Sequence, residues 1–376
     1  LLSGSGGNDT LVGGGGADTL AGGLGDDEMT VDSASDVVQE SAGQGVDTVV
    51  AWVDYALPTG TNGQVENLIL AGAANLQGTG NALDNILTGN SGNNLLDGGA
   101  GNDTMVGGDG NDTYDVDNAG DGVTETIADD TTTNGIVEGG LDTIRSLVTI
   151  GALASNVENL VLLGTASING LGNALANLLT GNNRDINSDS NTGNNLLNGM
   201  EGADTMAGGS GDDTYVVDNV GDQVIELGNQ GIDSVETNLA EYTLSDNVER
   251  LVLTGTTALR ATGNNLANVI EGNTLNNRID GGAGADTMSG GAGDDFYSVE
   301  SVGDLVVEIA GEGTDTVFST LASYLLPRNV EHLTLLGTAN INGIGNYLSN
   351  IIQGNSGNNE IDGGQFVDVL IGAGGN

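Results

Sequence analysis

The sequence predicts an all-β fold, a parallel β-roll or right-handed β-helix solenoid built from nine-residue half-turns. Two observations predict it. The nonapeptide pattern G-G-x-G-x-D-x-U-x, in which U is a large apolar residue, recurs in register along the chain. The 376 residues include 66 glycines and 2 prolines, a composition that suits tight turns, and helical periodicity is not evident anywhere. The clearest copies of the pattern are 13–21, 22–30, 98–106, 107–115, 208–216, 281–289 and 290–298.

Each position of the nonapeptide has a structural role. Glycines at the first, second and fourth positions allow positive φ and a tight turn, which directs several carbonyl oxygens into one small space. The Asp at position six adds a carboxylate, and calcium is a hard cation that binds about six to eight such oxygens. The next residues favour a short strand whose position-eight side chain points inward. These inward residues are Leu11, Leu20, Met29, Met105, Tyr114, Met206, Tyr215, Met288, Tyr297 and Leu370.

Loop and strand together make half a coil, so two nonapeptides make one turn. A single coil cannot bury its apolar face, and a single loop supplies too few oxygens. Stacking solves both problems, because an ion can lie between the loops of successive coils. The alternative, a β-hairpin or a disordered Gly/Asp-rich linker, is disfavoured by the regular apolar residue at position eight.

The recurring pattern resembles the RTX (repeat-in-toxin), or haemolysin-type, calcium-binding repeats of secreted bacterial proteins. The resemblance implies several bound Ca²⁺ ions, each shared by glycine-loop carbonyls and the aspartates of adjacent turns. The implied aspartate ligands are Asp9, Asp18, Asp27, Asp103, Asp112, Asp204, Asp213, Asp286, Asp295 and Asp368. The implied loop glycines are Gly14, Gly16, Gly23, Gly25, Gly99, Gly101, Gly108, Gly110, Gly209, Gly211, Gly282, Gly284, Gly291 and Gly293. Phe366 replaces the fourth-position glycine of the last block, which makes the Asp368 site doubtful.

A longer repeat is superimposed on the nonapeptide. Units at 13–97, 98–198, 199–280 and 281–362 share one order of features, with 1–12 as the end of a preceding unit and 363–376 as the start of a further one. We therefore predict one continuous calcium-binding solenoid fragment over 1–376, cut from a longer array. Each unit has a Gly-x-Asp-Thr/Ser step, at Asp47, Asp142, Asp233 and Asp315, and these aspartates could equally bind calcium or not. Each unit also has a Val-Glu-x-Leu segment, at Glu66, Glu158, Glu249 and Glu331.

Other coils carry Asn where the Asp would be, as at Asn85 and Asn94. Neutral Asn tolerates the turn conformation and offers side-chain hydrogen bonds, so we expect these coils to be metal-free. Residues 184–192 interrupt one unit and alternate oxygen-bearing side chains. An EF-hand is disfavoured there because Ser190 and Leu196 replace the Gly and Glu that its loop requires, so a surface loop is expected.

Composition excludes several functions. The formal charge is −47, with only 6 basic residues, which argues against nucleic-acid binding and against anionic membrane surfaces. The longest apolar run, 49–53, is far too short for a membrane span. The chain has no cysteine, so disulfides and thiolate metal sites are excluded and rigidity must come from stacking and ions.

We expect this chain not to be an enzyme, although a longer parent could carry a catalytic domain. His332 is the only histidine, and its repeat position is otherwise held by Asn67, Asn159 and Arg250. The recurring glutamates have no partner acid at fixed spacing, so a structural ladder is favoured over a glycosidase pair. No nucleotide-binding loop, nucleophile elbow or zinc pattern is present.

Three functions remain open. The favoured one is an extracellular structural or adhesive element of a surface layer, matrix or filament, which calcium stiffens and which associates end to end into fibres. The alternative is the calcium-dependent region of an enzyme or toxin exported by type I secretion, whose catalytic domain lies outside this chain. The least favoured is a polysaccharide- or ice-binding solenoid, because no flat Thr or aromatic row runs through all units. The resemblance implies an extracellular or cell-surface location.

Overall fold

The computed structural model describes residues 1–125, 139–182, 193–257 and 259–375. In this part of the chain, the regular structure is β-strand apart from one 3-10 turn, η1 (Gly60–Asn62). Most strands pair in parallel with the strand two positions further along the chain, as β2 pairs with β4, whereas β15 pairs with β16. The predicted all-β solenoid with stacked parallel strands is confirmed.

The strands are short, and most of them have two to four residues. The first half of the chain contains, in order, β1 (Leu2–Gly6), β2 (Thr10–Val12), β3 (Thr19–Leu24), β4 (Glu28–Val31), β5 (Val37–Val38), β6 (Thr48–Ala51), β7 (Tyr55–Ala56), β8 (Asn67–Leu70), β9 (Gln77–Thr79), β10 (Ile86–Thr88), β11 (Leu95–Asp97), β12 (Thr104–Val106), β13 (Thr113–Val116), β14 (Gly122–Thr124), β15 (Thr143–Ser146), β16 (Asn159–Leu162), β17 (Gly170–Leu171), β18 (Leu178–Thr180) and β19 (Leu196–Asn198). The rest contains β20 (Thr205–Ala207), β21 (Thr214–Val217), β22 (Gln223–Val224), β23 (Ser234–Thr237), β24 (Glu241–Thr243), β25 (Arg250–Leu253), β26 (Arg260–Thr262), β27 (Val269–Glu271), β28 (Arg278–Asp280), β29 (Thr287–Ser289), β30 (Phe296–Val299), β31 (Leu305–Val306), β32 (Thr316–Ser319), β33 (Ser323–Leu325), β34 (His332–Leu335), β35 (Asn342–Ile344), β36 (Ile351–Gln353), β37 (Ile361–Asp362) and β38 (Val369–Ile371).

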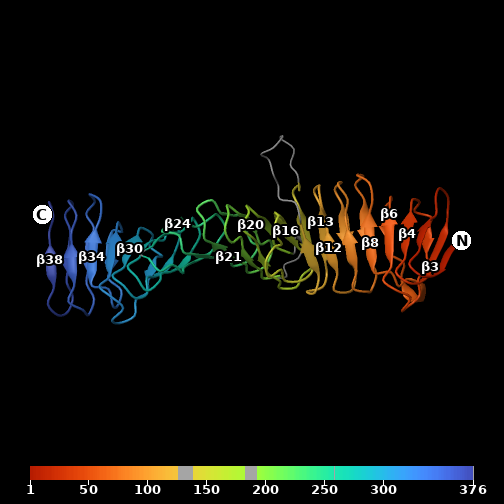
Figure 1. Ribbon diagram of the computed structural model, residues 1–376. Coiled ribbons are helices and arrows are strands. Elements are labelled where there is room, and N and C mark those ends of the chain that lie inside the picture. Colours follow the sequence, from red (N-terminus) through yellow and green to blue (C-terminus); the bar gives the residue numbers. More distant parts are fainter. Residues whose placement is uncertain (126–138, 183–192, 258, 376) are drawn as a thin grey trace. The chain divides into compact units, whose positions relative to one another are not determined.

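The chain divides into two compact units. The first comprises Leu1–Asn183 and Gly199–Thr205, and the second comprises Arg184–Asn198 and Met206–Asn376. In the first unit, β2, β4, β6, β8, β10, β12 and β14 follow one another in one sheet (Figure 1). A second sheet of the same unit has the order β7, β9, β11, β13, β15, β16 and β18. The prediction that 1–376 form one continuous solenoid, with the long repeat boundaries given above, stays a prediction.

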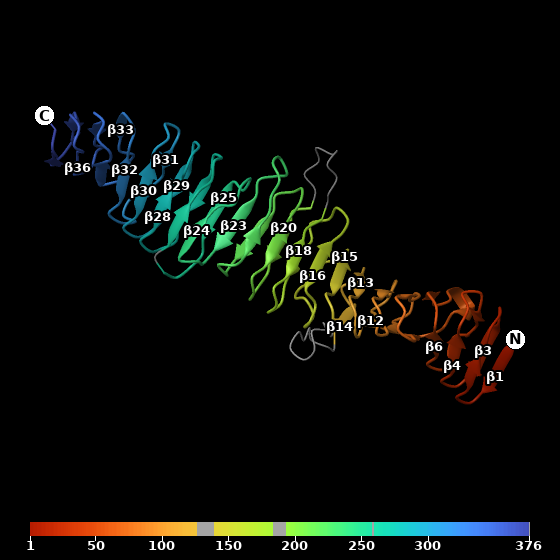
Figure 2. The ribbon, with the colours of Figure 1, turned by 90° about the horizontal axis from the view of Figure 1, so that it is seen from above.

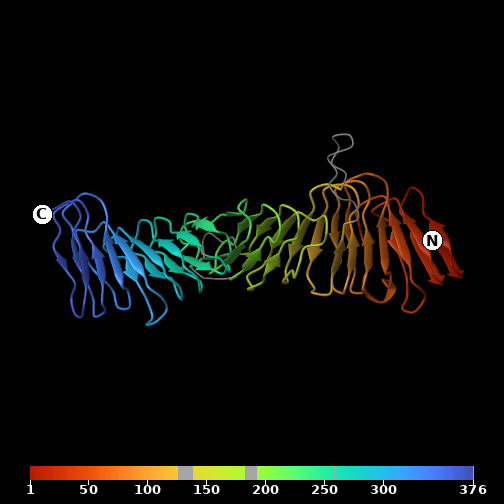
Figure 3. The same cartoon turned by 60° about the vertical axis from the view of Figure 1, so that its left-hand side comes forward.

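The second unit repeats this arrangement. Strands β19, β21, β23, β25, β27, β29 and β31 form one sheet, part of which is visible in Figure 2. Strands β24, β26, β28, β30, β32, β34, β36 and β38 form another, and its last strands, blue in Figure 3, lie side by side. In both units, residues that pair between neighbouring regular coils are 18 residues apart, which is the length of two nonapeptides. Examples are Thr10↔Glu28 and Arg278↔Phe296. Two nine-residue half-turns therefore make one turn.

The core consists of the position-eight side chains and the apolar residues stacked on them. Strand residues alternate between the core and the outside, so each short strand contributes one or two buried side chains. Met105, Tyr114, Met206 and Tyr215 are fully buried, as predicted for the inward position. Leu370 is 48% exposed on β38, which pairs with β36 on one side.

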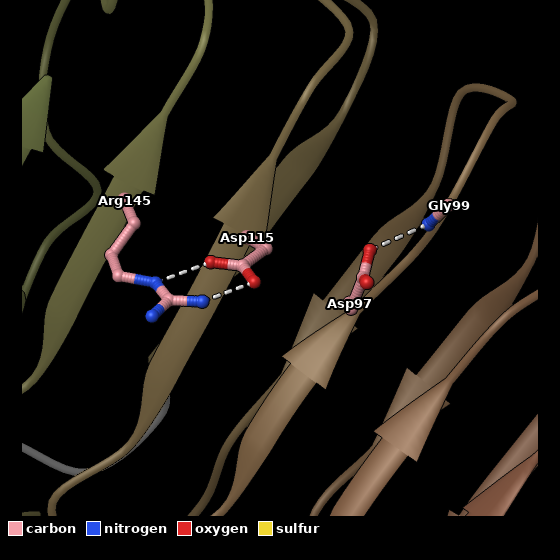
Figure 4. Close-up of polar contacts among 4 residues, drawn as sticks. All are labelled: Asp97, Gly99, Asp115 and Arg145. Atoms are coloured by element: carbon pink, nitrogen blue, oxygen red, sulfur yellow. Dashed lines mark hydrogen bonds and ion pairs between the residues drawn. The ribbon is translucent and has the colours of Figure 1, made fainter. Parts of the chain in front are cut away.

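The outer faces of the strands carry both charged and apolar side chains, among the latter Ile86 (50% exposed) and Phe296 (39% exposed). Asp97, Asp115 and Arg145 occupy matching positions on β11, β13 and β15. The Arg145 guanidinium holds the Asp115 carboxylate with two hydrogen bonds, one of them 2.6 Å from Nε to Oδ1, while Asp97 accepts the amide of Gly99 (Figure 4). Trp52 also lies on the outside, 56% exposed.

Candidate metal centre

The glycine loops adopt the predicted turn with one correction. Second- and fourth-position glycines such as Gly99 and Gly101 have positive φ, +77° and +155°. First-position glycines do not have positive φ, contrary to the prediction. They are required because a Cβ would collide with the loop's own carboxylate: on Gly98 it would lie 2.5 Å from Oδ2 of Asp103. The first glycine therefore makes room for the acid, and the other two shape the turn.

The position-six aspartates are linked from turn to turn by their Oδ1 atoms. Each Oδ1 accepts the backbone N–H of the residue at the equivalent position one turn earlier. We call this series of bonds the carboxylate ladder. Its members include Asn85 N–H to Asp103 (2.7 Å), Asn94 N–H to Asp112 (2.6 Å), Asp27 N–H to Asp47 (2.9 Å) and Asp213 N–H to Asp233 (2.9 Å). One carboxylate oxygen thus fixes the loop geometry.

The second carboxylate oxygen, Oδ2, is buried without a hydrogen-bond partner in many of these aspartates. The residues concerned are Asp9, Asp27, Asp47, Asp103, Asp112, Asp213, Asp286 and Asp295. Burial raises the pKa of Asp103 to about 6 and that of Asp295 to about 7, because charged groups lose hydration there. A buried, unsatisfied anionic oxygen is costly unless a cation binds it.

The coils with Asn at position six differ from the Asp coils in the hydrogen bonding of that side chain. Asn85 accepts the amide of Asn81 (2.7 Å), and its Nδ2 donates to the carbonyls of Val65 and Glu66, both at 3.1 Å. Asn94 likewise accepts the amide of Asn90 and donates to the carbonyl of Leu76. The side-chain amide therefore satisfies the turn by itself, which agrees with the expectation that Asn coils need no metal.

The structure separates the predicted aspartates by burial. Asp27, Asp103, Asp112, Asp204, Asp213, Asp286 and Asp295 are buried, whereas Asp9, Asp18 and Asp368 are only partly buried. Phe366, at the fourth position of the last loop, has φ +73°, which is strained for any residue with a Cβ. The predicted set of ligands stays a prediction.

The intermediate aspartates are part of the same ladder. Asp47, Asp142, Asp233 and Asp315 are buried, with at most 1% of each exposed. The recurring glutamates follow them: Oε2 of Glu66 accepts the Asp47 amide, and Oε2 of Glu249 accepts the Asp233 amide, both at 2.9 Å. The glutamates thus occupy the structural ladder expected for them.

Two further sets of acids were missed by sequence reasoning. Asp36, Asp121 and Asp304 continue the ladder, each accepting the amide of a position-six aspartate 18 residues earlier. Glu40, Glu125, Glu226 and Glu308 are buried next to the loops. The signal that could have found both is the 18-residue spacing of one full turn.

Two further candidates from the sequence are the 184–192 insertion and His332. The 184–192 insertion falls outside the described residues. His332 is half-buried on β34, with Nδ1 3.5 Å from Oγ1 of Thr316. Within the described ranges, no helical segment has the length and hydropathy of a membrane span.

A family model described as the RTX calcium-binding nonapeptide repeat (4 copies) matches residues 1–38, 79–114, 189–223, 262–297 and 344–376. The chain is built on RTX repeats. This confirms the resemblance drawn from the nonapeptides. A comparison with curated proteins gives no match.

The RTX loops fit calcium on their own geometry. The ion requires oxygen ligands, and several Asp coils present a buried Oδ2 without a hydrogen-bond partner beside a tight glycine turn. The aspartates that meet this condition in the nonapeptides and would hold the ion are Asp27, Asp103, Asp112, Asp213, Asp286 and Asp295. When bound, calcium would neutralise carboxylates on adjacent turns and so join them.

Proposed function

We propose that this chain is an extracellular calcium-binding structural element that folds and stiffens as its RTX repeats bind the ion. The observation that carries the proposal is the recurrence of buried Oδ2 atoms without hydrogen-bond partners through the Asp coils. Buried anionic oxygens destabilise the metal-free fold, so binding energy becomes folding energy. Calcium is plentiful outside cells, and a chain of charge −47 repels itself until cations bind.

The role is mechanical rather than catalytic in this proposal. The recurring Glu66 and Glu249 are engaged with backbone amides of the ladder, and His332 lies on an outer strand position. These contacts support a function in which the acids hold the coils together. A filament or matrix component would use the stacked coils as a stiff spacer, and sedimentation with and without calcium tests whether the chain also forms fibres.

The decisive experiment is far-UV circular dichroism of metal-stripped protein during a calcium titration, with magnesium as the matched control. The expected result is a transition from coil to β-structure that calcium produces and magnesium does not. A full strand spectrum in chelator, unchanged by calcium, would overturn the proposal, since the Asn coils would then hold the fold alone.

A further inference from the structure

We propose that in each long repeat the aspartate of one nonapeptide loop shares a three-carboxylate calcium site with two further acids, whereas the other loops hold a single aspartate. The sites are Asp27, Glu40 and Asp47; Asp112, Glu125 and Asp142; Asp213, Glu226 and Asp233; and Asp295, Glu308 and Asp315. In each of them, one oxygen from every residue lies within 4.8 Å of the others. The inference rests on the proposed calcium binding and adds a second class of site to it.

The glutamate enters the site through a gap left by glycine. Glu40 lies one turn after Gly22, the first glycine of the Asp27 loop, and accepts its backbone N–H. A Cβ on Gly22 would lie 2.3 Å from Oδ2 of Asp27 and 2.6 Å from Oε1 of Glu40. The aspartate and glutamate oxygens therefore converge over one glycine. Asp47 joins them from the next turn, where its Oδ1 is used by the ladder.

In the second unit a tyrosine takes part. The Tyr215 hydroxyl accepts the Gly208 N–H (2.7 Å) and donates to Oε1 of Glu226. The Tyr297 hydroxyl connects Gly290 and Glu308 in the same way. Met29 occupies the equivalent position of the first repeat, where the glutamate takes the glycine amide directly. The tyrosine is a positioning residue that orients the glutamate.

In the second unit, one oxygen of the glutamate and one oxygen of the loop aspartate have no other partner. Oε2 of Glu226 and of Glu308 are buried without a hydrogen bond, as are Oδ2 of Asp213 and of Asp295. The side chains themselves are more than nine-tenths buried, with Glu226 6% and Glu308 8% exposed. A cluster of acids on the surface would be solvated, but these acids are enclosed and mutually repulsive.

Among the described residues, Arg145 pairs with Asp115, Arg250 with Glu271 and Arg260 with Glu241, and none of these six residues is a member of a cluster. Carboxylates are ligands for hard cations, and calcium accepts several of them at once in flexible geometry. Because calcium affinity rises with the number of charged ligands, we expect these sites to fill before the single-aspartate loops.

The test measures calcium stoichiometry of the whole chain by isothermal titration calorimetry, with circular dichroism to verify folding. Glu226→Gln and Glu308→Gln remove one carboxylate each at nearly constant size. Each is expected to lose one ion from the tightest class, and the double variant two. The matched control is Glu236→Gln on β23, where the side chain alternates outward between buried Val235 and Thr237, and it is expected to behave as wild type.

The outcomes separate this inference from the proposed function. Unchanged stoichiometry and affinity in both glutamate variants, with calcium still bound, would overturn the three-carboxylate site alone. Absence of calcium binding by the wild-type chain would overturn both.

A second measurement applies if a glutamate variant fails to fold. Terbium bound in these sites should be excited through Tyr215 and Tyr297. Emission should therefore fall in the Tyr215→Phe/Tyr297→Phe double variant and persist in Tyr347→Phe, where the ring is 65% exposed. Emission at wild-type intensity in the double variant contradicts the inference.

Discussion

The backbone N–H of Asp27 donates to Oδ1 of Asp47, one turn later in the coil, at 2.9 Å. The same bond joins Asp295 to Asp315 in the second unit, also at 2.9 Å. One oxygen of the side chain closes the turn, and the other is left for a cation. Structure and metal binding therefore use different atoms of one residue, and substitutions can separate them.

Asp103→Asn keeps Oδ1 for the Asn85 amide but replaces the oxygen offered to the ion. Calcium binding at this loop should weaken by about 10-fold or more, because a charged ligand is lost. The strand spectrum at saturating calcium should be retained. Calorimetry and circular dichroism measure the two effects. Glu236→Gln, on the outer face of β23, is the control and should leave both unchanged. An equal loss in the control would contradict the assignment.

Gly98→Ala tests the space that the first glycine provides. The new Cβ would lie 2.5 Å from Oδ2 of Asp103, so the loop or the carboxylate must shift. We expect a cost of about 1–3 kcal/mol in the free energy of unfolding at saturating calcium. Gly15→Ala is the control, since a Cβ there meets no atom within 4 Å. Urea denaturation compares the two, and matching midpoints would refute the steric explanation.

Asn268→Ala tests the metal-free coils. The Asn268 side chain accepts the amide of Asn264 (2.8 Å) and donates to the carbonyl of Val248 (3.0 Å). Its loss should destabilise the fold by about 1–3 kcal/mol, because buried polar groups are left unpaired. This deficit should be the same at every calcium concentration that supports folding, and the number of bound ions should not change. A deficit that disappears at high calcium would mean that this coil binds the ion.

The metal-free fold should be more stable in mild acid than at alkaline pH. Burial raises the pKa of Asp233 to about 7 and of Glu226 to about 8, above the values near 4 expected in the unfolded chain. The folded state then binds more protons, so stability is greatest below about pH 4 and is lost as pH rises through about 6 to 8. Thermal melts of metal-stripped protein between pH 5 and 8 measure the effect.

Calcium should abolish this dependence, because it displaces protons from the same oxygens and the unfolded carboxylates are already deprotonated above about pH 5. Melting temperatures at saturating calcium should therefore be nearly independent of pH over the same range. If the melting temperature of the metal-stripped protein instead rises between pH 5 and 8, burial does not raise the pKa values of these carboxylates.

Much of the fold follows from local sequence. Met105 and Tyr114 lie nine residues apart in equivalent positions of consecutive nonapeptides. Their inward orientation can therefore be predicted from the sequence alone. The turn glycines Gly99 and Gly101 follow from the same period. The role of Gly98 was misjudged, because a collision with a side chain depends on packing in three dimensions.

The acids beside the loops were harder to find. Glu40 acts on Gly22 across one full turn, and the residues between Glu40 and Asp47 break the nine-residue spacing. Between Glu125 and Asp142 the interruption is longer. A motif defined by consecutive spacing cannot relate such residues, although they lie together once the coils stack.

The ladder makes the two faces of a coil complementary. Asn85 presents an amide donor toward the following turn, and Asp103 presents the acceptor toward the preceding one. Any two coils of this kind can therefore stack on each other without a change in the sequence of either. Duplication or loss of a whole turn leaves no mismatched partner at the junction, so the length of an array of this kind is free to drift in evolution while its chemistry stays constant.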